Sequence, residues 1–178
     1  RNQLNAVTSI PKDFARSNEI ISDLSDFASL FPNVNSIGSN SFIETPMLNQ
    51  MKLPKALVLI EGAFEKSAIS NVVFEDGGKG HLTIGGQNFK DCVNLKTLVL
   101  PANLIYWDNY TTRGSGITKI YIKATVPPTL EKGYGDNYNQ IDLFVPIGCA
   151  SLYASATNWS AFKTITEYNF DLNPDNVE

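Results

Sequence analysis

The sequence predicts a right-handed, β-rich α/β repeat solenoid, with a parallel β-sheet on one face, short helices or turns on the other, and a C-terminal cap. Two observations predict this fold class: an apolar pattern recurs four times along the chain, and a phenylalanine precedes the first three copies at a nearly constant spacing. Such repetition is typical of solenoids, in which each short unit buries its apolar edge against its neighbours. The 178 residues suit a single domain.

The recurring pattern places apolar residues at the first, fourth and sixth positions of a short segment. Its copies are Leu48-Met51-Leu53, Ile69-Val72-Phe74, Leu95-Leu98-Leu100 and Ile117-Ile120-Ile122. Their first members are 21, 26 and 22 residues apart, in or just outside the range of about 20–29 residues in leucine-rich repeats. The longest interval contains the polar, glycine-rich run 75–81, which predicts an enlarged turn.

A phenylalanine lies five or six residues before each of the first three copies, at Phe42, Phe64 and Phe89. We expect these rings to form a ladder on the side of the core opposite the strands. The fourth copy has Thr111 and Thr112 where the phenylalanine belongs, so that repeat is degenerate. Alternating apolar residues also occur in β-sandwiches, the alternative architecture. The shared register of rings and apolar triads favours the solenoid.

Four regions of one structural domain follow from this pattern, with the repeats over 37–130. Residues 1–36 form an N-terminal cap or a degenerate repeat. Ile10 and Phe14 match the start of a copy, but the strand pattern after them fails at Asp23 and Ser25. The alternative is a helix, because apolar residues also recur there at helical spacing. These residues are Ile20, Leu24, Phe27 and Phe31.

Residues 131–170 are predicted to form a closing repeat and cap. Within them, 150–159 is predicted as a short helix that covers the C-terminal end of the core. Its apolar residues at helical spacing are Leu152, Tyr153, Ala156 and Trp159. The segment 171–178 has a proline and three acidic residues and little to bury, so we expect a loose tail.

Composition excludes several partners. The 14 Lys and Arg against 18 Asp and Glu give a net charge of −4 without any basic run, so nucleic acid is not expected as a partner. The longest apolar run, 56–60, is far shorter than the roughly 20 residues of a membrane span. Cys92 and Cys149 are too few for a disulfide scaffold or metal cluster and are expected to be small buried residues. No cofactor is expected.

Two stretches resemble a known family. Ile-Gly-x-x-x-Phe at 84–89, followed by Phe-Lys-Asp-Cys-Val-Asn-Leu-Lys-Thr-Leu-Val-Leu-Pro at 89–101, is similar to the repeat of BspA-like leucine-rich-repeat proteins, a family of bacterial surface and secreted proteins. The segment 120–130, with 143–148, 152–153 and 159–160, resembles the closing segment of that family. The resemblance covers about 37–168 and departs from the family at the enlarged third turn and the missing fourth phenylalanine.

The resemblance implies an extracellular or cell-surface binding protein engaged in adhesion or host interaction, with an extracellular protein or glycan as partner. The chain starts at Arg1 and shows no apolar signal-peptide core. We therefore expect either that a signal or lipoprotein segment was removed or that the chain is excised from a longer protein.

A strip of residues on the exposed side of the predicted sheet is the first candidate binding site. Side chains alternate across a strand, so these positions face away from the core, and a curved solenoid commonly binds partners there. Tyr121 between two lysines is of the kind enriched at interfaces. The strip consists of Gln50, Lys52, Asn71, Val73, Thr97, Val99, Lys119, Tyr121 and Lys123. A merely solvated strand face is the alternative.

The loop 106–113 is the second candidate, because Tyr106, Trp107, Tyr110 and Arg113 suit an interaction hot spot or a carbohydrate platform. Buried packing at the irregular fourth repeat explains the same composition.

Metal and catalytic sites have weaker support. Glu75-Asp76-Gly77-Gly78 and the acidic stretch 136–142 offer oxygen ligands without the spacing of an EF-hand, so no metal site is predicted. Glu61 and Glu65 lie on one turn, but a carboxylate pair alone is weak evidence for glycan hydrolysis. No catalytic site is predicted. The competing functions are a structural spacer or display module of a larger surface protein and a glycan-processing enzyme.

Overall fold

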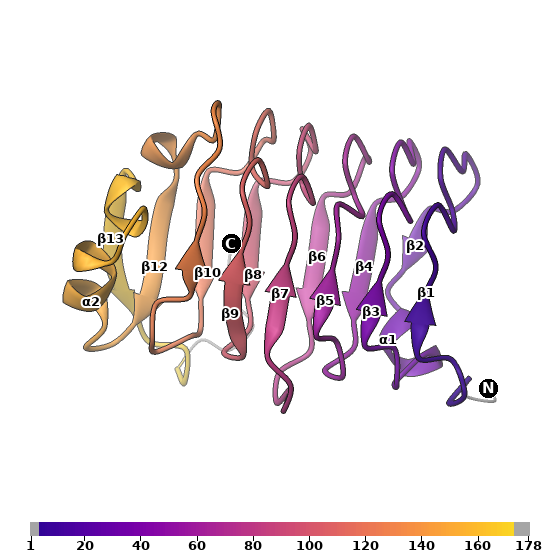
Figure 1. Ribbon diagram of the computed structural model, residues 1–178, viewed down its shortest axis with the longest axis horizontal. Coiled ribbons are helices and arrows are strands. Elements are labelled where there is room, and N and C mark those ends of the chain that lie inside the picture. The colour runs from indigo at the N-terminus through magenta and orange to yellow at the C-terminus, as the bar shows by residue number, and fades with distance from the viewer. Residues whose placement is uncertain (1–3, 173–178) are drawn as a thin grey trace.

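The chain coils through parallel strands that lie in two facing layers (Figure 1). A computed structural model describes residues 4–172. The strands are β1 (Ser9–Ile10), β2 (Asp23–Leu24), β3 (Ser36–Ile37), β4 (Gln50–Leu53), β5 (Leu59–Ile60), β6 (Asn71–Phe74), β7 (Leu82–Ile84), β8 (Thr97–Leu100), β9 (Leu104–Trp107), β10 (Lys119–Ile122), β11 (Thr129–Leu130), β12 (Asp142–Pro146) and β13 (Thr164–Tyr168). The helices are α1 (Phe27–Leu30) and α2 (Ala150–Ser155), with 3-10 helices η1 (Tyr138–Gln140) and η2 (Trp159–Ala161).

The predicted apolar triads form one layer, here called the triad face, which consists of β2, β4, β6, β8, β10, β12 and β13. The last two members of each of the four triads lie in β4, β6, β8 and β10. Met51, Leu53, Leu98 and Leu100 are almost completely buried, because alternate side chains of a strand point to the same side. The predicted parallel sheet of a repeat solenoid is therefore confirmed.

The opposite layer consists of short strands, where the sequence predicted turns or short helices. It is a parallel sheet in the order β1-β3-β5-β7-β9-β11, here called the isoleucine face. Ile10, Ile37, Ile60 and Ile84 are paired in register from one turn to the next. β-Branched side chains favour extended backbone and pack well on a neighbouring strand, so this column of isoleucines forms strands.

The phenylalanine ladder is present between the two layers. The rings of Phe42 and Phe64 stack with centroids 5.5 Å apart, and those of Phe64 and Phe89 stack at 5.8 Å. Phe14 packs edge-on against Phe42 at 6.2 Å. Each fully buried ring contributes about 1.5–3 kcal/mol to folding.

The degenerate fourth repeat uses other residues to fill the core. Trp107 continues the isoleucine column, since it pairs with Ile84 on one side and with Leu130 on the other. Thr111 and Thr112 are fully buried in place of the phenylalanine. The Thr112 hydroxyl donates to the carboxylate of Asp136 at 3.4 Å, and the Tyr110 amide donates to the same carboxylate at 2.9 Å. Asp136 thus ties the fourth repeat to the closing segment.

The described part of the N-terminal unit, residues 4–36, contains short strands that pair with those of the next turn. β1 pairs with β3 and β2 pairs with β4, so this unit adds a strand to each face. The helical alternative is wrong over most of its length, because Ile20 is 86% exposed and α1 has only four residues.

The C-terminal end is covered by α2 and the last strand, β13, as Figure 1 shows, and η2 packs against α2. Tyr153 and Trp159 are fully buried, whereas Leu152 is exposed, so the predicted helical contact holds in part. The Tyr153 hydroxyl donates to the Ala124 carbonyl at 2.8 Å, and the Trp159 ring nitrogen donates to the Pro128 carbonyl at 2.7 Å. Most of the predicted loose tail lies outside the described residues.

Candidate binding groove

Side chains that point outward from the triad face form two rows that cross the strands. The register of the strand pairs aligns them within β2, β4 and β6 and within β8, β10, β12 and β13. The first row is polar and consists of Asp23, Gln50, Asn71, Thr97, Lys119, Asp142 and Thr164. The second row is mostly apolar in its middle and consists of Lys52, Val73, Val99, Tyr121, Phe144 and Thr166. The rows place apolar side chains beside polar ones along the axis of the solenoid.

The triad face is broken between β6 and β8. Hydrogen bonds join β2, β4 and β6 into one sheet and β8, β10, β12 and β13 into another, and no ladder joins the two sheets within residues 4–172. Two local features distinguish the strands at the break. Phe74 is bulkier than Leu53 and Leu100, which hold the equivalent position, and it is only partly buried whereas they are fully buried. Pro101, which follows β8, has no amide hydrogen to donate.

The break leaves backbone groups of both strands without ladder partners. The carbonyls of Lys96 and Leu100 accept hydrogen bonds from the β10 segment, so the alternation of a strand directs the N–H and C=O groups of Thr97 and Val99 toward β6. The carbonyls of Asn49 and Leu53 accept from the β6 segment. By the same alternation, the backbone groups of Val72 and Phe74 point toward β8.

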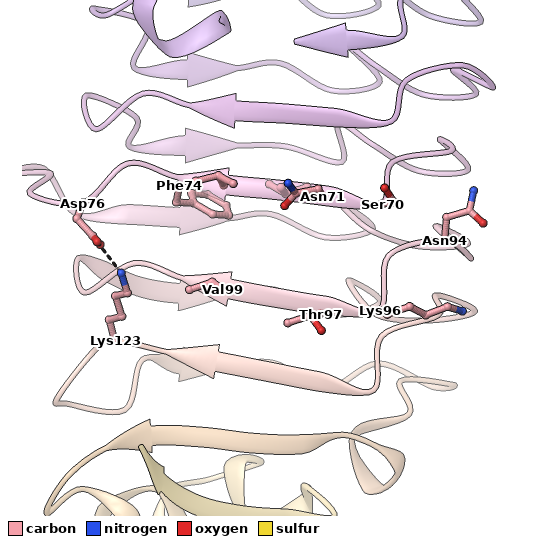
Figure 2. A pocket seen from close by; sticks show the side chains of 11 residues that line it. Ser70, Asn71, Phe74, Asp76, Asn94, Lys96, Thr97, Val99 and Lys123 are labelled. Carbon is pink, nitrogen blue, oxygen red and sulfur yellow. Dashed lines mark hydrogen bonds and ion pairs between the residues drawn. The ribbon is translucent and has the colours of Figure 1, made fainter. Parts of the chain in front are cut away.

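A groove of about 710 Å³ lies over the break. Figure 2 shows Phe74, Val99 and Thr97 along its middle, with Asn71 beside them. Its lining residues are Ser70, Asn71, Val72, Val73, Phe74, Asp76, Asn94, Lys96, Thr97, Val99 and Lys123. The volume falls within the range of about 300–1,000 Å³ typical of ligand sites, and the mixture of apolar and polar groups is typical of them too.

Charged residues lie at both ends of the groove (Figure 2). At one end, Lys123 forms an ion pair with Asp76 at 2.5 Å, and this pair spans β8. At the other end, the Lys96 ammonium donates to the Val93 carbonyl at 2.8 Å and lies near Asn94 and Ser70. The groove is therefore apolar in the middle and polar at its ends.

Five residues of the predicted strip line this groove, namely Asn71, Val73, Thr97, Val99 and Lys123. Lys119 and Tyr121 lie on the triad face but do not line it. The prediction that Tyr121 is an exposed contact residue is wrong, since it is 6% exposed. Its ring stacks on Phe144 at 4.3 Å and meets the ring of Tyr168 at 5.0 Å, so its large aromatic surface is used for packing.

The second predicted candidate, 106–113, is only in part a loop. Tyr106 and Trp107 belong to β9, and Trp107 is fully buried. Trp107 is therefore a core residue, in agreement with the alternative interpretation that this segment packs in the interior. Tyr110 and Arg113 do lie beyond the strand, with the guanidinium 5.9 Å from the centre of the ring.

Sequence reasoning missed several lining residues, including Phe74 on the groove side, Asp76, Asn94 and Lys96. The available signal was the 26-residue interval between the second and third triads, together with Pro101. Both point to a disturbance of the regular ladder between β6 and β8.

The acidic loops considered for metal have other partners. Glu75 pairs with Lys52 at 3.2 Å, and Asp142 pairs with Lys163 at 3.2 Å. Within residues 4–172, no three His, Cys, Asp or Glu side chains gather in a way that could hold a metal ion.

Glu61 and Glu65 both line a shallow, polar hollow at the turns between the faces. Glu65 is held by the Lys90 ammonium at 2.6 Å, and the Ser39 hydroxyl donates to Glu61 at 3.4 Å. Each of the two carboxylates therefore interacts with a side chain of a neighbouring turn.

Comparison with known proteins identifies the repeat. Residues 22–142 match the family model described as a BspA type leucine rich repeat region, in six copies. No curated protein matches the chain. No helix within residues 4–172 is both long and apolar enough to cross a membrane. The matched segment covers more than half of the chain and includes the whole of β6, β8 and β10.

Proposed function

Because the chain belongs to the family of proteins with a BspA-type leucine-rich-repeat region, we propose that it is a non-catalytic module that binds an extracellular protein in the groove between β6 and β8. Repeat proteins of this class typically bind other proteins on an extended face, and the family is typically associated with the cell surface. The proposed setting is the exterior of a bacterial cell, where such binding serves adhesion or host interaction.

The observation that carries this proposal is the break in an otherwise regular ladder. A spacer needs only a continuous stack of repeats, and the pairing on the isoleucine face continues from β5 through β7 to β9, with one register shift between Leu82 and Thr83. On the triad face, the interruption exposes Val73 to 43% and places a partly buried phenylalanine beside it. Exposed apolar surface beside polar and charged side chains favours contact with another molecule.

A binding screen with a groove variant tests the proposal. The purified chain is assayed against extracellular-matrix proteins and a glycan array, beside Val99→Arg, which fills the groove with a long charged side chain. Val126→Arg is the matched control, because Val126 is 74% exposed and does not line the groove. Both variants should keep the far-UV circular dichroism of the parent chain.

The proposal predicts a protein partner whose affinity falls at least about tenfold in Val99→Arg, equivalent to about 1.4 kcal/mol, and is unchanged in Val126→Arg. Equal binding by both variants would move the site elsewhere. A hit confined to glycans would replace the protein partner with a carbohydrate, and the absence of any hit would favour the spacer.

A further inference from the structure

The groove has a charge opposite to that of the chain as a whole. The chain carries a net charge of −4, yet Lys96 and Lys123 line the groove with Asp76 as its one carboxylate among the described lining residues. A smaller hollow of about 360 Å³ adjoins it and shares Phe74. Its lining adds two more lysines and only one more carboxylate, the residues being Lys52, Lys55 and Glu75.

Existing ion pairs do not neutralise this cluster. Lys52 is paired with Glu75, and Lys123 with Asp76. Both carboxylates are thereby used, while Lys96 donates to the Val93 carbonyl, which is uncharged. Four lysines thus face two carboxylates around one apolar centre, so the groove attracts negative charge.

The apolar middle of the groove indicates the chemical class of the ligand. Val73 is 43% exposed, and Phe74 and Val99 lie with it between the charged ends. A polypeptide can offer carboxylates and a large apolar side chain within a few residues of one another, so it matches both parts of the groove. A sulfated or carboxylated glycan would satisfy the lysines but would leave the apolar middle without an apolar partner.

We infer that the groove recognises an acidic segment of a polypeptide, with an apolar side chain seated on Phe74, Val73 and Val99 and carboxylates directed to Lys96 and Lys123. This inference rests on the proposed binding function of the same groove and adds the chemistry of the partner. The segment lies along β6 and β8, because Lys96 precedes β8, Lys123 follows β10, and the apolar centre lies between these two ends of the groove (Figure 2).

A library of random 12-residue peptides displayed on phage tests this inference with the intact chain as bait. Selections are run in parallel on the parent chain, on Val99→Arg, and on the double variant Lys96→Gln/Lys123→Gln. Lys66→Gln is the matched control, because Lys66 also pairs with a carboxylate, that of Glu44 at 3.7 Å, but lies outside the groove. A sulfated heparin oligosaccharide is titrated separately as the glycan probe.

The inference predicts enrichment of peptides that combine Asp or Glu with a large apolar residue. Synthetic versions should bind the double lysine variant about 3- to 10-fold more weakly, should bind Lys66→Gln normally, and should lose affinity between about 0.05 M and about 0.5 M NaCl.

The other outcomes separate the two proposals. Peptides that are neutral or basic but are lost in Val99→Arg would overturn the acidic partner and leave the binding groove intact. Peptides that bind all variants equally, or no enriched peptides at all, would overturn both. Groove-dependent binding of the heparin oligosaccharide without any groove-dependent peptide would replace the polypeptide with an acidic glycan.

Discussion

At the scale of single residues, side chains that repeat in register hold the turns together. Phe42, Phe64 and Phe89 stack face to face, with planes only 9° and 5° apart. Phe64 is fully buried between two neighbours, whereas Phe14 at the start of the ladder is 55% exposed. The same residue type therefore contributes differently according to its place in the stack.

Replacing Phe64 with alanine is expected to destabilise the chain by about 3–5 kcal/mol, because it leaves a cavity between two stacked rings. Phe14→Ala is the control and should cost about 1 kcal/mol or less, since that ring already meets solvent. Urea unfolding followed by circular dichroism measures both values. Similar losses in the two variants would contradict the role assigned to the ladder.

Cys92 gives a pH dependence that can be checked. Its thiol is buried and donates to the Phe64 carbonyl at 2.9 Å, and burial raises its pKa from the ordinary 9.0 to about 11. The unfolded chain loses this proton first as the pH rises, so the native state binds more protons between pH 9 and about 11. Stability is therefore expected to fall across that window, by about 2–3 kcal/mol from this group.

The stability of Cys92→Ala, measured by urea unfolding, should decline less than that of the parent chain over the same pH range. Parallel curves for the two proteins would show that the thiol does not contribute. Tyrosines such as Tyr153, whose pKa is also raised by burial, are present in both proteins and cancel in the difference.

At the scale of elements, the apolar triads determine the strands of the triad face, and the column of isoleucines determines the strands of the isoleucine face. The four strands of the predicted triads lie where the spacing places them, because positions four and six of each triad must share one buried side. The opposite strands have only two to four residues, too few for an alternating pattern to show in the sequence. Their isoleucines favour extended backbone, and pairing with the next turn completes the strands.

The break between β6 and β8 makes a specific prediction for amide exchange. The Val99 amide of β8 points toward β6, where no ladder forms. The Tyr121 amide of β10 lies in the same row but points toward β8, with which β10 forms a ladder. Hydrogen exchange followed by NMR should show protection of Val99 at least about tenfold lower than that of Tyr121, because no ladder joins β8 to β6 on that side. Equal protection would mean that β6 and β8 pair in solution.

The candidate site was predictable only in part, for reasons that differ among residues. Asn71, Val73, Thr97 and Val99 follow from alternation within strands, which depends on local sequence alone. The burial of Tyr121 depends on Phe144 and Tyr168, which come from two later strands. The groove itself requires the loss of pairing between two neighbouring turns, and local patterns do not determine that.

At the scale of the whole molecule, one apolar core runs from Ile10 to Phe162 and the groove lies about midway along it. The C-terminal end is covered by α2 and β13, and the isoleucine face keeps its pairing past the groove. The break therefore opens one face of the solenoid without dividing the core. Such an arrangement leaves the candidate groove open on one face while the opposite sheet holds both halves together.

The most direct test of the account is the exchange footprint of the chain in complex with a protein partner captured in the screen. Hydrogen–deuterium exchange is compared for the free and bound chain, peptide by peptide. The account predicts slower exchange on binding in β6 and β8, at the amides of Thr97 and Val99 above all, where the free chain has no ladder. Protection confined to other segments, such as 104–113, with β6 and β8 unchanged, would contradict it.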